Sequence, residues 1–428
     1  MKSIVFFILS YPQVFKLITK LTALSNLIVH KGKNSPAGSK WEKFKQVFKR
    51  TLFCLITILF FKLCISPIIH LPETLSPFTN KIDDFELSDL CFAYFHKKVA
   101  DDTNIVIVNS NTHDAKTIAL NISRIEKYKP KAIGLDMNFY GPALSKDSKD
   151  FADTIIKYKD NLVLAEFTDK RLSKLPFYKT LNWKLNGIGG FNFGYVSIER
   201  VMHTKRNFTP YPFLGTTKVD AFAVKIIRIA YGNDKLTKLN DREREEELIN
   251  YRNGFFGTNR YTVIDSVLND SMLFHNKIVL FGNDDSTSIV DLYYTPLNKG
   301  FGRSIPDMHG IEYHAHIIST ILNNDYIDPI NRVSELSIIF LSCFCFMFFL
   351  NWLLKWHGLY HLVVDVLFLL ILVPVSIYLS YLSLEYFKVK TEPTHFVVPL
   401  FLCGIILHLY EPFVKMVKWF VNLKSKKN

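Results

Sequence analysis

The richest group of potential metal ligands in the sequence lies in the segment PDMHGIEYHAH. It supplies the carboxylate and imidazole groups of Asp307, His309, Glu312, His314 and His316, which suit zinc and similar ions. The spacing H-x-x-E-x-H-x-H differs from the H-E-x-x-H motif, which places two ligands one helical turn apart. His309 and His316 could share a helix face, but His314 is rotated away from them. We therefore predict no bound metal and no other cofactor, and we expect His314 on the buried side of a helix.

Motifs for covalent or phosphate chemistry do not accompany this group. The nucleophile motif G-x-S-x-G is absent from the sequence. Gly187–Gly190 (GIGG) lacks both the spacing and the Lys-Ser/Thr pair of a phosphate-binding loop. We therefore predict that the protein is not an enzyme. The alternative is a membrane-bound hydrolase, in which alanine at Asp136, Asp284 or His314 would abolish activity without unfolding the protein.

Four apolar stretches, each long enough to cross a membrane, dominate the rest of the sequence. A helix needs about 20 residues to span the ~30 Å apolar core of a bilayer. Core helices of a soluble protein are the alternative, but four stretches of this length in one chain are typical of membrane proteins. The predicted membrane helices are 51–71, 336–354, 359–382 and 396–413.

The distribution of charge predicts how these helices are oriented. The formal net charge is +13, yet residues 63–351 carry 33 basic and 34 acidic side chains. Residues 31–50 contain seven Lys or Arg and one Glu, and the tail 414–428 contains five Lys and no acid. By the positive-inside rule both termini are cytoplasmic, whereas the region 72–333 and the loop 383–395 lie outside. The basic excess then contacts anionic lipids, and we expect no nucleic-acid partner.

This topology places the protein in a bacterial inner (cytoplasmic) membrane, with residues 1–50 as a basic cytoplasmic segment. Within it, 1–30 is interpreted as an interfacial helix, although a further membrane segment or a secretory signal remains open. Five of the six cysteines lie in the predicted membrane helices, and only Cys91 lies in the exported region. That region therefore has no intramolecular disulfide and depends on its own apolar core.

The exported region alternates between strand-like and helix-like patterns. The run IVIVN is typical of a buried strand, and the isoleucines that follow recur at helical spacing behind Asp114, which can cap the helix. Such alternation predicts an α/β domain with a mostly parallel sheet. The charged run Asp241–Glu247 is interpreted as a solvated helix face. The predicted strands are Ile105–Asn109, Lys131–Asp136, Asn161–Ala165, Gly190–Val196 and Lys277–Gly282, and the predicted helices are Asp114–Tyr128, Asp150–Tyr158, Val219–Tyr231 and Ile311–Leu322.

Polar residues follow three of the predicted strands. Because ligands bind beyond the carboxyl ends of parallel strands, these residues are candidates for a binding rim. The alternative is that each of them only caps or turns a loop. The candidates at the strand ends are Asn109, Asp136, Asn138, Asp284 and Asp285.

Five segments, in order, resemble the second type of CHASE domain (cyclases/histidine kinases associated sensory extracellular). The strand–helix–strand region carries the family's "PK-x-IG-x-D" at Pro130–Asp136. The similarity covers about 72–330 and extends to the arrangement of one membrane helix before the domain and three after it. The other four segments are Gly190–Arg206 with Thr209–Pro212, LINYR at 248–252, KIVLFG at 277–282, and YYTPLN at 293–298 with PDMHGIEYHAHIISTIL at 306–322.

The resemblance implies a sensory domain that binds an unknown small molecule or protein in the periplasm. It adds Arg206 and His314 to the candidate ligand-binding residues, and it implies homodimerisation. Two departures stand out: Asn109 replaces a frequent aspartate, and the acidic turn before the family's arginine is absent around Ile198–His203. Only 414–428 follow the last predicted membrane helix, so we expect a stand-alone member whose output is carried by a cytoplasmic or membrane partner.

Two charged residues lie inside the predicted membrane helices. Lys62 is near the middle of the first helix, and Asp365 is about two turns inside the third. Charges in hydrocarbon are costly unless they are paired or reach the interface. A Lys62–Asp365 pair would link the helix that enters the domain to those that leave it. The alternative is that Lys62 snorkels to the interface alone and Asp365 lies at the interface.

The sequence thus predicts a membrane-anchored extracytoplasmic sensor of bacterial signal transduction. The first alternative is an envelope scaffold whose domain binds other membrane or periplasmic proteins. The second is the hydrolase described above. A transporter would need more polar residues in its membrane helices than Lys62, Asp365 and His408.

Overall fold

The computed structural model of the chain forms two compact units. We call Ser76–Pro329 with Ile377–Thr391 the α/β unit, and the remaining segments the helical unit. The residues that the structure describes are 40–69, 84, 86–95, 102–110, 114–137, 146–167, 190–196, 204–214, 216–251, 260–262, 270–282, 292–298, 306–353 and 361–425.

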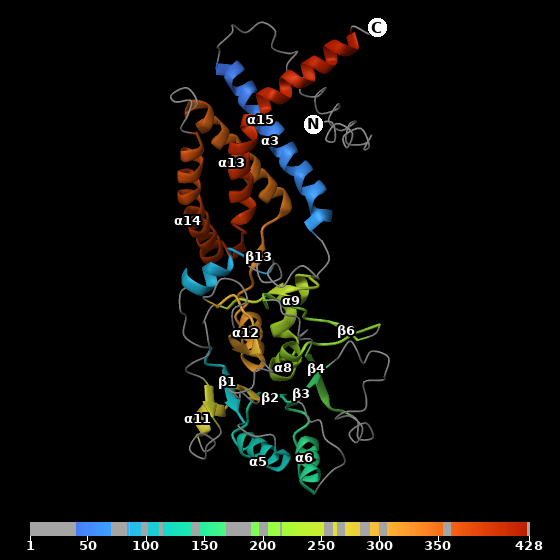
Figure 1. The fold of residues 1–428 in the computed structure, drawn as a ribbon. Coiled ribbons are helices and arrows are strands. Elements are labelled where there is room, and N and C mark those ends of the chain that lie inside the picture. Colours follow the sequence, from blue (N-terminus) through green and yellow to red (C-terminus); the bar gives the residue numbers. More distant parts are fainter. Residues whose placement is uncertain are drawn as a thin grey trace. The chain divides into compact units, whose positions relative to one another are not determined.

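A six-stranded sheet, in which all the pairs are parallel, forms the centre of the α/β unit (Figure 1). This confirms the predicted α/β class and mostly parallel sheet. The strand order is β4-β3-β2-β10-β1-β9. The strands are β1 (Ile105–Asn109), β2 (Ala132–Asp136), β3 (Leu162–Phe167), β4 (Asn192–Val196), β9 (Arg260–Thr262) and β10 (Ile278–Gly282).

The centre of this sheet is built from apolar, β-branched strands. All five residues of β10 are buried, and so are the first four of both β1 and β2. Strands covered on both faces read as continuous apolar runs rather than alternating ones. Although β10 is far from β1 and β2 in sequence, it lies between them and pairs with both.

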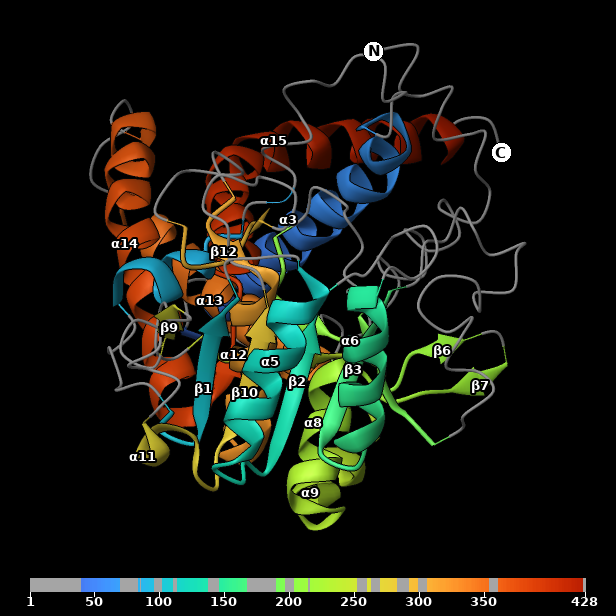
Figure 2. The same ribbon diagram turned by 90° about the horizontal axis from the view of Figure 1, so that it is seen from below.

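Two helices pack on each face of the sheet (Figures 1 and 2). On one face lie α5 (Ala115–Glu126) and α6 (Lys146–Lys157), and on the other lie α8 (Phe222–Tyr231) and α12 (Gly310–Leu322). Asp114 caps α5 as predicted, because its carboxylate accepts the Thr117 backbone N–H at 2.8 Å. Every residue of α12 is buried, including polar ones such as Glu312, His314 and His316.

A second group of short strands connects distant parts of the α/β unit. Leu248 in β8 (Glu247–Leu248) pairs with Asn207 in β5 (Asn207–Phe208) on one side and bridges Ile327 on the other. Directly after Ile327, β13 (Asp328–Pro329) pairs in parallel with β14 (Val389–Lys390). The loop between α14 and α15 is therefore part of the α/β unit.

The interpretation of Asp241–Glu247 as a solvated helix face is wrong. The short helix α9 ends at Asp241, and Glu247 begins a strand with its side chain 1% exposed. The reason is tertiary: the Arg242 guanidinium donates to both Glu247 carboxylate oxygens, at 2.7 and 2.9 Å. Most predicted strands and helices agree with the structure within a few residues, whereas α6 begins four residues before the predicted Asp150.

The helical unit contains long apolar helices. By length and composition, two of them could cross a membrane, at Arg332–Leu350 and Leu370–Phe387, and Thr394–Leu407 is a shorter apolar helix. Side chains of α3, α13 and α15 pack together around Cys54, Cys343 and Cys403. The number of membrane helices stays a prediction. The helices are α3 (Lys40–Ile69), α13 (Arg332–Leu353), α14 (His361–Phe387) and α15 (Thr394–Ser425).

The remaining described elements are small. They are the π-helix η2 (Cys91–Phe95), the hairpin β6 (Phe213–Leu214) and β7 (Thr217–Lys218), η5 (Asp234–Leu236), α9 (Thr237–Asp241), α11 (Ser271–Phe274), and the antiparallel pair β11 (Leu292–Tyr293) and β12 (Met308–His309).

Two glycines in the sheet test how closely α8 packs on it. A Cβ added at Gly194 would lie 2.6 Å from the Phe222 Cα, whereas one at Gly134 would meet the flexible end of the Ile226 side chain. We expect Gly194→Ala to destabilise the protein by about 1–3 kcal/mol, because backbone must move, and Gly134→Ala to cost less. Urea-dependent proteolysis of the full-length protein in detergent measures both. Equal losses would contradict this packing argument.

Candidate functional site

The backbone around Arg206 is held by segments far away in the sequence. The Arg206 carbonyl accepts the Ile249 N–H at 2.9 Å. At the preceding residue, the Lys205 N–H donates to the Tyr294 carbonyl at 2.8 Å, and the Tyr251 hydroxyl donates to the Lys205 carbonyl at 2.5 Å. Tyr251 is completely buried, so this bond fixes where the Arg206 side chain starts.

The Arg206 guanidinium is surrounded by acidic residues from the start of the α/β unit. It donates to both carboxylate oxygens of Asp89, at 2.8 and 2.5 Å, and to the Asp84 backbone carbonyl. The Asp84 carboxylate lies 3.4 Å from it and also accepts the Thr204 N–H and hydroxyl, at 2.6 and 2.7 Å. Two parallel bonds to one carboxylate are the strongest geometry open to an arginine. The segment 84–89 is thereby tied to 204–206.

Glu86 extends this cluster to the loop after α14. Its carboxylate lies 3.6 Å from Arg206 Nε and forms an ion pair with Lys390 of β14. Burial raises the pKa of Glu86, but the charges of Lys390 and Arg206 outweigh it and hold that pKa below its usual value. The pKa of Arg206 is raised although burial lowers it, because its acidic neighbours favour the charged form. Both groups are therefore ionised at neutral pH.

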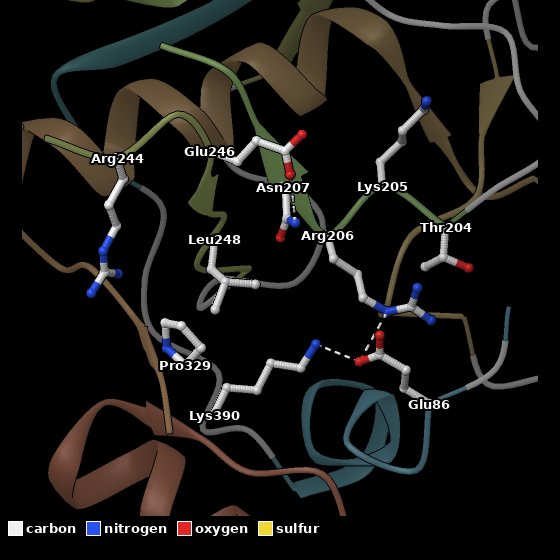
Figure 3. A pocket seen from close by; sticks show the side chains of 10 residues that line it. All are labelled: Glu86, Thr204, Lys205, Arg206, Asn207, Arg244, Glu246, Leu248, Pro329 and Lys390. Atoms are coloured by element: carbon white, nitrogen blue, oxygen red, sulfur yellow. Dashed lines mark hydrogen bonds and ion pairs between the residues drawn. The ribbon is translucent and has the colours of Figure 1, made fainter. Parts of the chain in front are cut away.

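A cavity of about 420 Å³ opens beside this cluster (Figure 3). Figure 3 shows the Glu86–Lys390 and Glu86–Arg206 ion pairs at one end and the Arg244 side chain at the other, with Leu248 and Pro329 between them. This volume suits a small ligand. The lining residues are Glu86, Thr204, Lys205, Arg206, Asn207, Arg244, Glu246, Leu248, Pro329 and Lys390, of which four are basic and two acidic.

The opposite end of the cavity has its own ion pairs. Arg244 lies 2.8 Å from Asp328 and 3.7 Å from Glu247, and Arg242 lies 2.6 Å from Asp328. Lys388, next to β14, pairs with Asp325 at 3.1 Å. The cations of the described lining thus have acidic neighbours in the protein, so a ligand would have to exchange contacts with existing ion pairs.

The histidine-rich segment forms part of the core. Among the residues that the structure describes, no three His, Cys, Asp or Glu side chains are grouped so as to hold a metal ion. His309, Glu312 and His316 are buried in β12 and α12. The His314 ring packs edge-on against Phe222 with centroids 4.9 Å apart, and burial lowers its pKa to about 3. His314 does not line the cavity.

Asp307 joins two of the segments singled out in the sequence. Its carboxylate accepts the Thr295 N–H at 2.9 Å and the Thr295 hydroxyl at 3.1 Å, next to the β11–β12 pair. Burial raises the pKa of Asp307 to about 7. The TPLN and PDM segments therefore form one local structure.

The strand-end candidates lie elsewhere. Asn109 and Asp136 are both in register with Gly282, on either side of β10, so the sheet does bring these two strand ends to one edge. Neither lines the cavity described above. Asn138, Asp284 and Asp285 fall outside the described residues, as do the side chains of Lys62 and Asp365, so the proposed membrane pair stays a prediction.

Of the predicted ligand-binding residues that the structure describes, Arg206 alone lines this cavity. Sequence reasoning missed Asp84, Glu86, Asp89 and Lys390. The acidic run DDFELSD at 83–89 could have indicated these partners. The acidic turn that precedes the family's arginine is absent here, so the acidic partners of Arg206 come from another segment. Lys390 carried no local signal.

The fold and the site define the class of the protein. It has an α/β domain with a parallel sheet, and the same chain contains long apolar helices. The CHASE2 domain family matches residues 76–350, more than half of the chain, and the chain belongs to this family. CHASE2 domains are sensory extracellular domains of signal transduction. No curated protein and no solved structure matches the chain.

Arg206→Gln removes the cation that neutralises two buried carboxylates. We expect a loss of about 3–5 kcal/mol in the free energy of unfolding, since breaking one partner of a buried pair leaves an uncompensated charge. Arg228→Gln is the matched control: Arg228 makes the same two-bond contact with Asp220, both at 2.8 Å, but its side chain is 31% exposed. The Arg228→Gln protein should lose at most about 1 kcal/mol in the free energy of unfolding. Similar losses in urea-dependent proteolysis would show that the Arg206 cluster does not stabilise the unit.

The raised pKa of Asp307 should make the free energy of unfolding depend on pH. An unfolded aspartate titrates near pH 3.9, whereas the folded one keeps its proton to about pH 7. Between these values the folded state binds more protons, so stability from this group falls as the pH rises. Asp307→Asn should therefore gain stability relative to the parent protein at about pH 8 but not at about pH 4.

Asp114→Asn is the control for this pH series. Hydrogen bonds from Thr117 hold the pKa of Asp114 below its usual value, so its contribution changes only in more acidic solution. The measurement is urea-dependent proteolysis at several pH values. An Asp307→Asn protein with the parent's pH profile would contradict the assignment.

Proposed function

We propose that the protein is a membrane-anchored receptor-like protein of bacterial signal transduction, whose α/β unit lies outside the cytoplasmic membrane. The observation that carries this proposal is that the loop after α14 belongs to the α/β unit. β13 and β14 pair, Lys390 pairs with Glu86, and Lys388 pairs with Asp325. Any rearrangement at these contacts acts directly on the ends of two apolar helices.

The cavity supplies a mechanism for such a rearrangement. A small polar ligand that contacts Arg206 or Lys390 competes with Glu86 for them. If it binds one arrangement of the ion pairs better than the other, it shifts the population toward that arrangement. The α14–α15 loop then moves with Lys390, and the apolar helices carry the change inward to a cytoplasmic or membrane partner.

The orientation rests on charge and hydropathy. Basic segments at 31–50 and 414–428 favour cytoplasmic termini, and the membrane helices 51–71, 336–354, 359–382 and 396–413 complete a multi-pass topology. Ile377–Thr391, which contains the end of α14 and the chain that follows it, belongs to the α/β unit. This supports placing the α/β unit and the α14–α15 connection on the same side of the membrane, as four spans require.

An envelope scaffold is the second candidate function. The charged cavity favours the sensor, because a scaffold needs no cavity lined by exchangeable ion pairs. A hydrolase is the least favoured, since no serine, cysteine or histidine is among the described residues that line the cavity. Homodimerisation, expected of such receptors, is likewise a proposal.

Cross-linking mass spectrometry in the native membrane tests the sensor. We expect the tail 414–428 and the connection near Lys355 to cross-link to a signalling partner, and Lys390→Ala to change those cross-links. Lys238→Ala is the control, because it removes a lysine of the same unit that does not line the cavity and donates to the Asn324 carbonyl. Cross-links confined to the α/β unit, with a tail that touches only lipid in all three proteins, would support the scaffold instead. Cross-links between two copies would report the dimer.

A further inference from the structure

The π-helix η2 has one buried side and one exposed aromatic side. Cys91 and Phe92 are buried, and the Phe92 ring packs edge-on against Tyr251 with centroids 6.4 Å apart. The next turn presents Tyr94 and Phe95, whose side chains are 56% and 45% exposed. π-helical turns are rare and are frequently found at functional sites.

This turn lies against the last third of α14. In Figure 1 it is the cyan coil beside the end of that helix. The Cys91 thiol donates to the Ile377 carbonyl at 3.8 Å, and the rings of Phe95 and Tyr381 lie 5.8 Å apart. Tyr381 in turn packs on Tyr378, which is exposed, with centroids 6.1 Å apart. We call Tyr94, Phe95, Tyr378 and Tyr381 the aromatic collar.

The polar contacts of α14 begin at the level of the collar. Leu370, Ile371 and Val375 are exposed apolar residues before it, in the candidate membrane stretch Leu370–Phe387, which also contains the two collar tyrosines of this helix. From the collar onward, the Ser380 hydroxyl donates to the Thr391 carbonyl and the Ser383 hydroxyl to the Val389 carbonyl. Tyrosine and tryptophan gather where a membrane helix meets water, because their rings are apolar and their polar atoms need partners.

We propose that the aromatic collar lies in the headgroup region of the outer leaflet, with η2 resting in the membrane surface. The partner is a lipid bilayer, because the exposed collar residue Tyr378 directly follows the exposed apolar residues Leu370, Ile371 and Val375 along α14. The proposal depends on α14 crossing the membrane, which is part of the proposed function. It goes beyond that function by assigning lipid contact to a segment outside every predicted membrane helix.

This placement connects the membrane surface to the cavity. The acidic residues that hold Arg206 lie in 84–89, and the chain runs directly from Asp89 into η2. On its buried side, Phe92 packs on Tyr251, whose hydroxyl donates to the carbonyl beside Arg206. A shift of η2 in the bilayer therefore acts on the same ion pairs that a ligand would contact.

Photolabelling of the full-length protein in vesicles of phosphatidylethanolamine and phosphatidylglycerol tests the proposal. A phospholipid with its diazirine at headgroup level should label Tyr94, Phe95 and Tyr378, as mapped by mass spectrometry. A second lipid with its diazirine at the chain end should label Leu370 and Ile371, about 12 Å further along the helix, and should not label η2. Phe213 and Met272, exposed apolar residues of the same unit, are the unlabelled controls.

The outcomes separate this inference from the membrane topology. Labelling of Leu370 and Ile371 without any labelling of Tyr94 or Phe95 would overturn the collar and leave α14 as a membrane helix. Labelling of neither would overturn both. Protein cross-links between Tyr94 regions of two copies, in place of lipid labelling, would assign the surface to a dimer and overturn the lipid contact.

Discussion

The neutralisation of one buried guanidinium organises much of the α/β unit. A charge removed from water is costly unless opposite charges and hydrogen bonds surround it. Arg206 meets this requirement with Asp84 and Asp89, so the first described segment of the unit must pack beside 204–206. Glu86 then faces the same cluster and attracts Lys390. A local electrostatic need thus draws the α14–α15 loop into the domain.

The short strands connect distant segments of the chain around the cavity. β5, β8, β13 and β14 contribute few hydrogen bonds, yet each joins segments that are far apart in the chain. Three of their side chains, Glu247, Asp328 and Lys390, take part in the ion pairs at the two ends of the cavity. Such pairs have alternative partners nearby, and competing partners of similar energy are what a two-state sensor needs. A close-packed apolar core offers fewer such alternatives.

The six-stranded sheet has a different role. Its apolar strands and the fully buried α12 form the rigid support on which the polar cluster is held. His314 illustrates the difference: a titratable side chain inside this core is kept neutral by burial, whereas Glu86 beside the cavity is kept ionised by its neighbours. The ion pairs that the proposed ligand would contact therefore lie beside the cavity, outside the apolar core.

The sequence by itself determined the local features: the β-branched strand IVIVN, the Asp114 cap, the isoleucine face of α5 and the long apolar helices. These depend on residues a few positions apart, so pattern and spacing are sufficient. Family membership and the parallel sheet also followed from the order of such segments. Only the tertiary structure placed β10 at the sheet centre, buried Glu247 against Arg242, and brought Asp89 to Arg206 and Lys390 to Glu86. Those contacts join residues that are separated by short or long loops, and their partners are chosen by burial and charge, which no local pattern records.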